Sequence, residues 1–119
     1  MKKNIATSSI PSLIMGCVLC RLRQQAGLDQ RGIARCLGIT QASWSRIENG
    51  HATANIAQII NSCNAMGIDF LYVAQLYTYI CNQLVKKSVV LSNDNSNFVE
   101  VRAVIKEVIS EHFLSGSSR

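Results

Sequence analysis

The chain has few of the residues that interrupt helices. Its 119 residues contain a single proline and seven glycines, and runs of β-branched residues are few before residue 88. Proline and glycine disfavour helix interiors, and β-branched residues are enriched in strands. The scarcity of all three favours an all-α fold. A hydrophobic share of 48% argues against a disordered chain, because it is large enough to form a buried core.

A long hydrophobic run is also missing. No stretch reaches the roughly 18 apolar residues that a membrane-spanning helix needs. The first residues, MKKNIATSSIPSLIMGC, have a faint likeness to a secretion signal. Their apolar run is too short for that role, and it is interrupted by Ser8, Ser9, Pro11 and Ser12. We therefore expect a cytoplasmic protein with no membrane partner.

Cysteine frameworks and catalytic clusters are absent from the sequence as well. The five cysteines are odd in number and lack disulfide-like spacing, which indicates reduced cytosolic thiols. Cys17 and Cys20 form one C-x-x-C, but a zinc site would need a second pair or a nearby histidine. We find neither a nucleophile paired with a base nor a phosphate-binding loop. The sequence therefore predicts no metal, no cofactor and no enzyme activity.

Acidic residues are scarce in the first part of the chain. Residues 1–68 carry seven lysines and arginines against two acidic residues, whereas residues 69–119 carry five of each. The whole net charge of +5 therefore lies in residues 1–68. Such an asymmetry suggests a polyanionic partner for this part. On charge alone, an ordinary basic surface explains it equally well.

Apolar periodicity and capping residues predict five helices in the part of the chain before residue 88. Asp29 caps a short second helix, QRGIARCL, and Thr40 caps an equally short third helix that is closed by Gly50. Asp69 caps a longer fifth helix. In the fourth helix we expect a core stripe of Ile56, Ile59, Ile60, Cys63 and Met66. The five helices are expected at about 12–26, 30–37, 41–49, 54–66 and 69–87.

A linker and one more helix are expected after the fifth helix. Residues 88–97, SVVLSNDNSN, break the apolar pattern. Residues 98–113 resume it and favour a helix by their length, although alternation over 98–105 also allows a strand. The fifth and the last helix each carry an apolar seam at coiled-coil-like spacing. These seams are Phe70, Val73, Tyr77, Ile80 and Leu84, and Phe98, Val101, Ile105 and Val108.

The second and third helices form a helix-turn-helix pattern with the LGIT segment between them. Ala34 is small enough to let two helices cross closely, and Gly38 suits a left-handed turn. Trp44 and Ile47 lie three residues apart, so they share a face that can be buried. The opposite face of the third helix is then left for a polar partner. Other expected core positions are Ile33, Leu37 and Ile39.

From Met15 to about Val73 the chain resembles the phage repressor and Cro family, also called the xenobiotic-response-element family. The resemblance is carried by LRQQAGLDQRGIARCLGITQASWSRIENG. The family favours L-R-x-x-x-G-L-T-Q, then L-A-x-x-L-G, then S-x-x-x-E-N-G. Gly32, Asp29 and the proline-free HATAN segment depart from its pattern. The resemblance implies a five-helix headpiece at 12–73, preceded by a flexible arm at 1–11 and followed by a helical extension at 74–119.

This resemblance implies a sequence-specific regulator of transcription in a bacterium or a phage. It would be a repressor that binds double-stranded DNA as a homodimer and associates with the nucleoid. An alternative is an antitoxin, in which the same headpiece binds its own promoter and the extension neutralises a toxin protein. A neighbouring toxin gene or a co-purifying small protein would separate the two hypotheses.

The same resemblance assigns roles to single residues. Gln41, Ala42, Ser45 and Arg46 would face base edges in the major groove, where arginine suits guanine and glutamine suits adenine. Arg46 could otherwise be an ordinary solvated arginine. An ion pair is implied between Arg23 and Glu48. The residues expected to contact phosphates are Gln30, Thr40, Ser43, Asn49 and His51.

The extension is expected to hold two copies together. A single recognition helix reads only a few base pairs, and family members therefore dimerise to read two half-sites. We predict that the two apolar seams build this dimer interface. In the alternative, the last helix folds back and completes the core of its own chain, because an apolar stripe does not reveal which chain covers it.

Overall fold

The computed structural model describes residues 9–87 and 98–116, and these residues are entirely helical apart from their connecting loops. The predicted linker at 88–97 and most of the predicted arm at 1–11 lie outside the described residues. A helix covers 98–105, so the strand alternative for this segment is wrong. In order, the helices are α1 (Ile10–Gln25), α2 (Gln30–Leu37), α3 (Gln41–Glu48), α4 (Ile56–Met66), α5 (Phe70–Lys86) and α6 (Phe98–Gly116).

Short polar side chains start four of these helices. Asp29 Oδ1 accepts the N–H of Gly32 at 2.7 Å and so begins α2. Asn55 begins α4 with a reciprocal capping box to Gln58. Ser9 caps α1, which begins at Ile10, two residues earlier than predicted. Thr40 caps α3 in the same way. Asp69 occupies the N-cap position of α5, as predicted, but its side chain makes no capping hydrogen bond.

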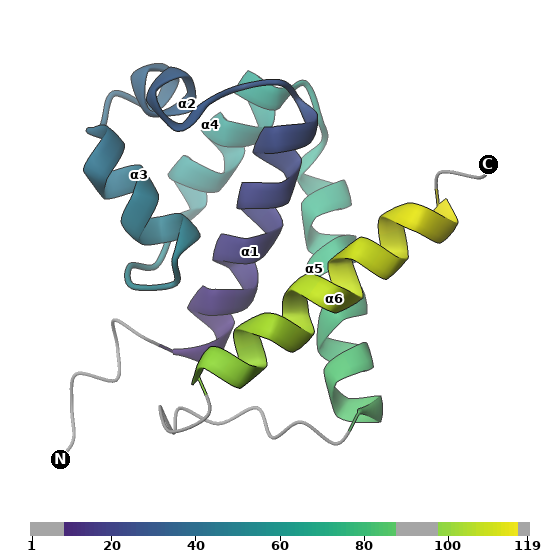
Figure 1. The fold of residues 1–119 in the computed structure, drawn as a ribbon. Coiled ribbons are helices and arrows are strands. Elements are labelled where there is room, and N and C mark those ends of the chain that lie inside the picture. The colour runs from purple at the N-terminus through teal and green to yellow at the C-terminus, as the bar shows by residue number, and fades with distance from the viewer. Residues whose placement is uncertain (1–8, 88–97, 117–119) are drawn as a thin grey trace, which may run out of the picture.

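Helix α1 is the centre of the fold (Figure 1). It contacts α3, α5 and α6, so apolar residues are buried on several of its sides. Leu13, Val18 and Leu19 are completely inaccessible to solvent, and Met15 is half-buried. The buried surface of α1 therefore extends over more than one face of the helix.

The predicted core stripe of α4 is partly wrong. Ile59, Cys63 and Met66 are buried, but Ile56 is 60% exposed and Ile60 is 41% exposed. The buried face continues instead through Ser62, whose hydroxyl donates to the carbonyl oxygen of Ile59 at 2.9 Å. This local bond satisfies the hydroxyl, and so a serine that the predicted apolar stripe did not include is buried on the core face of α4.

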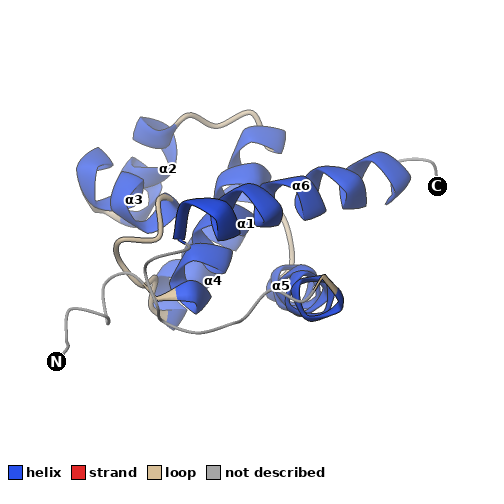
Figure 2. Cartoon of the chain, turned by 60° about the horizontal axis from the view of Figure 1, so that its bottom comes forward, coloured by secondary structure: helices blue, strands red, loops and turns tan. Residues whose placement is uncertain are grey.

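Helix α6 folds back across α1 and α5 of the same chain (Figures 1 and 2). Its Val101, Ile105 and Val108 are buried in the common core, and so are Val73, Ile80 and Leu84 of α5. These six residues of the predicted dimer interface are therefore covered within one chain. Phe98 begins α6, Tyr77 is half-buried, and Phe70 is 43% exposed. The alternative arrangement, in which the last helix completes its own core, is the one observed.

Over residues 9–87 and 98–116, every helix is too short or too polar to cross a lipid bilayer.

Candidate nucleic-acid interface

Helices α2 and α3 are joined by a tight turn. Gly38 ends α2 with φ of 71°, a left-handed conformation that glycine adopts without strain. The next residue, Ile39, donates its N–H to the carbonyl oxygen of Ala34 at 3.1 Å. Thr40 then begins α3 by accepting the N–H of Ser43 at 3.0 Å. The two short helices therefore meet at a fixed angle, with α3 at the edge of the molecule (Figure 1).

One face of α3 is held in the core. Trp44 is fully buried and Ile47 is 4% exposed. Glu48, at the end of the helix, is also buried, and its carboxylate accepts hydrogen bonds from three helices. The indole Nε1 of Trp44 donates to Oε2 at 2.5 Å, and Gln30 Nε2 of α2 donates to Oε1 at 2.8 Å. Arg23 of α1 supplies the third partner.

The implied ion pair between Arg23 and Glu48 is present. Arg23 Nε lies 2.6 Å from Oε2 of Glu48, and Nη2 lies 3.1 Å from Oε1. The two side chains are only 11% and 4% exposed. Arg23 Nη1 also donates to the carbonyl oxygen of Leu28 at 2.9 Å. The guanidinium therefore ties α1 both to the loop before α2 and to the end of α3.

The carboxylate of Glu48 is stabilised in its charged form. Burial raises the pKa of Glu48, but the hydrogen bonds from Arg23, Gln30 and Trp44 and the charge of Arg23 outweigh burial. The net result is a pKa below the ordinary 4.5. In turn, the hydrogen bond to Glu48 raises the pKa of Arg23. Both members of the pair are therefore ionised at neutral pH.

The other face of α3 is open to solvent. Gln41, Ala42 and Arg46 are exposed, while Ser45 is partly buried. Arg46 Nη2 donates to the carbonyl oxygen of His51 at 3.2 Å, so the guanidinium leans towards the loop after α3. Gln41 Nε2 points to Oε1 of Gln30 at 3.5 Å, which is a long contact. All four predicted base-reading residues lie on α3, but Ser45 is the least accessible.

The predicted phosphate-contacting residues lie around the two ends of α3. Thr40 and Ser43 are exposed at its start, where Thr40 Oγ1 donates to Ser43 Oγ at 2.9 Å. Asn49 and His51 are exposed after its end, and Asn49 Nδ2 donates to Ser45 Oγ at 3.3 Å. Gln30 begins α2 beside Gln41 and is shared with Glu48. These side chains therefore border the exposed face of α3.

Two residues that support this surface were not singled out from the sequence. A Cβ at Gly16 of α1 would lie 2.3 Å from the carbonyl oxygen of Ile47 and 2.8 Å from that of Glu48. Only glycine allows so close an approach of α1 to the end of α3, and a glycine inside an otherwise regular helix is a recognisable signal of such packing. Arg102 of α6 donates to the carbonyl oxygen of Asn49 at 3.0 Å. No local pattern predicts a contact between residues this far apart in the chain.

Residues 14–69 match the family model described as a helix-turn-helix domain. The segment is therefore similar to a helix-turn-helix domain, and the match covers slightly less than half of the chain. The match spans α2 and α3 with most of α1 and all of α4. Helix-turn-helix domains are DNA-binding modules. No curated protein and no solved structure matches the chain. The helix-turn-helix domain makes a DNA-binding regulator the function class that the comparison supports.

Proposed function

We propose that this protein is a sequence-specific regulator of transcription that binds double-stranded DNA and acts as a repressor. One observation carries the proposal: α3 presents Gln41, Ala42 and Arg46 to solvent on one face while Trp44 and the Glu48 cluster fix its other face. A rigidly held helix with polar side chains facing outward is the form that enters the major groove. The site of action is then the cytoplasm, at the nucleoid.

We assign different DNA contacts to single residues of α3. Arg46 reads guanine, because its fork matches the O6 and N7 acceptors, and Gln41 reads adenine through N6 and N7. Ala42 contacts a thymine methyl group, and Ser45 contacts a base at the margin of the interface. Binding exchanges the Arg46 contact with the His51 carbonyl for a base contact. The phosphate contacts are made by Gln30, Thr40, Ser43, Asn49 and His51.

We also propose that the protein binds DNA as a homodimer, through a surface that differs from the buried seams. Leu71 and Val85 are each 63% exposed on α5, and a groove runs along the same face, lined by Leu71, Ala74, Gln75, Thr78, Tyr79 and Asn82. Residues 70–85 contain no charged side chain. A second copy therefore meets this face without charge repulsion, and pairing two recognition helices supplies the second half-site.

The decisive experiment is selection of bound sites from random duplex DNA by the full chain. We expect an enriched, two-fold symmetric sequence, and affinity that falls steeply with salt because phosphate contacts release counterions. A log–log slope near zero, or no enrichment, would contradict DNA recognition. Isolation of a tightly bound small protein from the native host would instead support the antitoxin alternative.

A further inference from the structure

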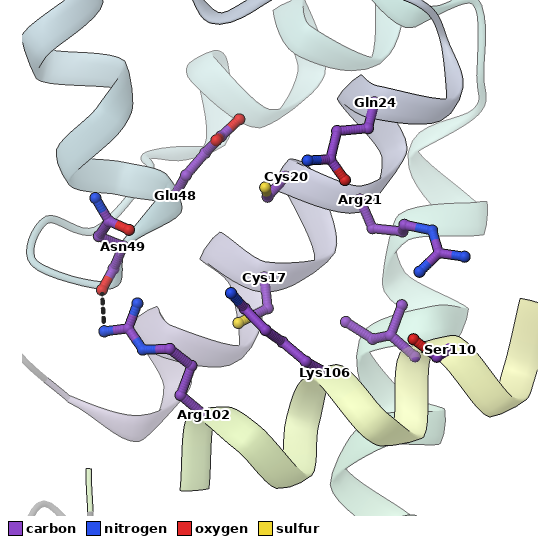
Figure 3. Close-up of a pocket in the computed structure, with 10 residues that line it drawn as sticks. Cys17, Cys20, Arg21, Gln24, Glu48, Asn49, Arg102, Lys106 and Ser110 are labelled. Carbon is purple, nitrogen blue, oxygen red and sulfur yellow. Dashed lines mark hydrogen bonds between the residues drawn. The ribbon is translucent and has the colours of Figure 1, made fainter. Parts of the chain in front are cut away.

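A cavity of about 210 Å³ lies between α1, the end of α3 and α6 (Figure 3). Helix α1 contributes the thiols of Cys17 and Cys20, and α6 contributes Arg102 and Lys106. Asn49, which follows α3, closes the cavity on the side of the DNA-reading helix. The volume is below the roughly 300–1,000 Å³ typical of pockets for drug-sized ligands. It suits a small metabolite or ion.

The lining of this cavity is strongly cationic. Arg21, Arg102 and Lys106 all line it, and Glu48 is the one acidic residue among the described residues of its lining. The carboxylate of Glu48 is paired with Arg23 at 2.6 Å. The three basic side chains in the lining give the cavity a positive potential, which attracts a bound anion.

The charges of Lys106 and Arg102 also act on the thiol of Cys17, which forms one wall of the cavity. Burial raises the pKa of Cys17 to about 11, while the charges of Lys106 and Arg102 act in the opposite direction. Cys17 therefore remains a neutral thiol at physiological pH and places no negative charge in the cavity. A negatively charged ligand would therefore be attracted by the basic side chains and would not be repelled by the Cys17 thiol.

Two of the cations are held in place by neighbours. The guanidinium of Arg21 lies 4.8 Å from the centre of the Phe113 ring, a cation–π contact that places it at the rim of the cavity. Arg102 Nη2 donates to the carbonyl oxygen of Asn49 at 3.0 Å (Figure 3). This bond connects α6 directly to the C-terminal end of α3, and it passes along the edge of the cavity.

We propose that this cavity binds a small anion through a phosphate or carboxylate group held by Arg102 and Lys106. Arginine and lysine form their shortest and strongest hydrogen bonds with such groups. Gln24 and Ser110 line the same space and supply further hydrogen-bonding groups. Because Arg102 also holds Asn49, an anion that engages Arg102 changes the support of the DNA-reading helix. This second step rests on the proposed DNA-binding function, whereas anion binding itself does not.

The first test uses inorganic phosphate as the probe and no DNA. Phosphate is titrated into the full chain at constant ionic strength, with chloride as the balancing anion, and binding is followed by amide chemical shifts. We expect saturable shifts around Cys17, Lys106 and Ser110. Lys106→Met should lower phosphate affinity by about two- to fivefold, as removal of one exposed ionic contact does. The double variant Arg102→Gln/Lys106→Met should lower it further.

The matched control is Lys86→Met, which removes one exposed lysine from the end of α5, outside the cavity lining. Its phosphate affinity should equal that of the parent. Absence of saturable binding would overturn the proposal, and so would equal losses in Lys86→Met and Lys106→Met. Because Lys106 is itself exposed, its variant should keep the thermal transition of the parent, and a melt verifies this.

The second test measures coupling to DNA with a selected site. Saturating phosphate should change the DNA affinity of the parent by about fivefold or more, the usual lower range of allosteric coupling, relative to Lys106→Met. Equal changes in both proteins would mean that phosphate competes at the DNA surface. That result would contradict the coupling to DNA binding but not the binding of phosphate in the cavity. Failure to bind any DNA would contradict the proposed function without affecting the phosphate titration.

Discussion

At the scale of single residues, Glu48 connects three helices. Its carboxylate accepts hydrogen bonds from Arg23 of α1, Gln30 of α2 and Trp44 of α3. It is buried, and the described residues contain no buried side-chain nitrogen or oxygen atom without a partner. A change at this position therefore disturbs the relative placement of the three helices that form the reading surface.

We expect Glu48→Gln to lower the free energy of unfolding by about 3–5 kcal/mol, because the charge of Arg23 is left buried without its counter-ion. Thermal or urea unfolding followed by circular dichroism measures the loss. Glu107→Gln is the matched control, because Glu107 is exposed on α6. A Glu48→Gln protein that unfolds like the parent would show that the pair contributes nothing.

The same carboxylate predicts a dependence of stability on pH. The folded-state pKa of Glu48 is lowered from 4.5, so the native protein binds this proton less readily than the unfolded chain. The stabilisation is therefore complete above pH 4.5 and is lost as pH falls through the folded value. The difference in unfolding free energy between parent and Glu48→Gln should be constant at higher pH and shrink in acid. A gap that stays constant in acid would assign the stability to other contacts.

Gly16 should tolerate no side chain. A Cβ there would meet backbone oxygens of Ile47 and Glu48 at 2.3 and 2.8 Å, so α1 and α3 would have to separate. Gly16→Ala should cost about 1–3 kcal/mol, as overpacking of a core does, measured by urea unfolding. Gly32→Ala is the control, since the nearest atom to its Cβ would be a side-chain oxygen of Asp29 at 3.0 Å. Equal stability of the two variants would contradict the close helix contact.

At the scale of elements, the proposed DNA contacts assign specificity and affinity to different residues along α3. Arg46→Ala should cost about 1–3 kcal/mol at its cognate base pair and relax the preference there. Ser43→Ala should weaken binding to all sequences alike, because a phosphate contact carries no base information. Competition binding to single-base variants of the selected site measures both effects. A uniform loss for Arg46→Ala would make Arg46 a phosphate contact.

The element boundaries show what a single sequence reveals. The caps at Asp29 and Thr40 and the left-handed Gly38 placed α2 and α3 correctly, because these signals are local. The exposure of Ile56 and Ile60 was missed, since their spacing also fits a buried stripe and the choice depends on which helix lies opposite. The contact between Arg102 and Asn49 was equally hidden, because it joins helices that only the tertiary fold brings together.

At the scale of the whole molecule, most residues of the two predicted seams are buried, but they are covered within one chain and not by a second copy. Residues such as Val73 and Ile105 were predicted to be covered, and they are. The sequence does not distinguish burial by a second chain from burial by α6, because either arrangement removes the same side chains from solvent. The surface that we propose for pairing is the outer face of α5.

We expect the full chain to sediment as a dimer and Leu71→Lys to convert it to a monomer, since a charge at the centre of an apolar contact is left unpaired. Leu71 is 63% exposed, so the variant should keep its melting behaviour. Val99→Lys is the control, because Val99 is 79% exposed on α6. The proposed interface would be contradicted if the parent sediments as a monomer or if Leu71→Lys remains a dimer.

The position of α6 also has a consequence for synthesis of the chain. Helix α1 leaves the ribosome well before α6, yet part of its apolar surface is covered by α6. At about 5–20 residues per second, synthesis takes several seconds to proceed from α1 to α6, and this apolar surface stays uncovered during that time. Closing α6 onto α1 joins residues far apart in sequence, which is a slow kind of folding step. The apolar surface of α1 is therefore exposed to aggregation, and to chaperones, until α6 has emerged.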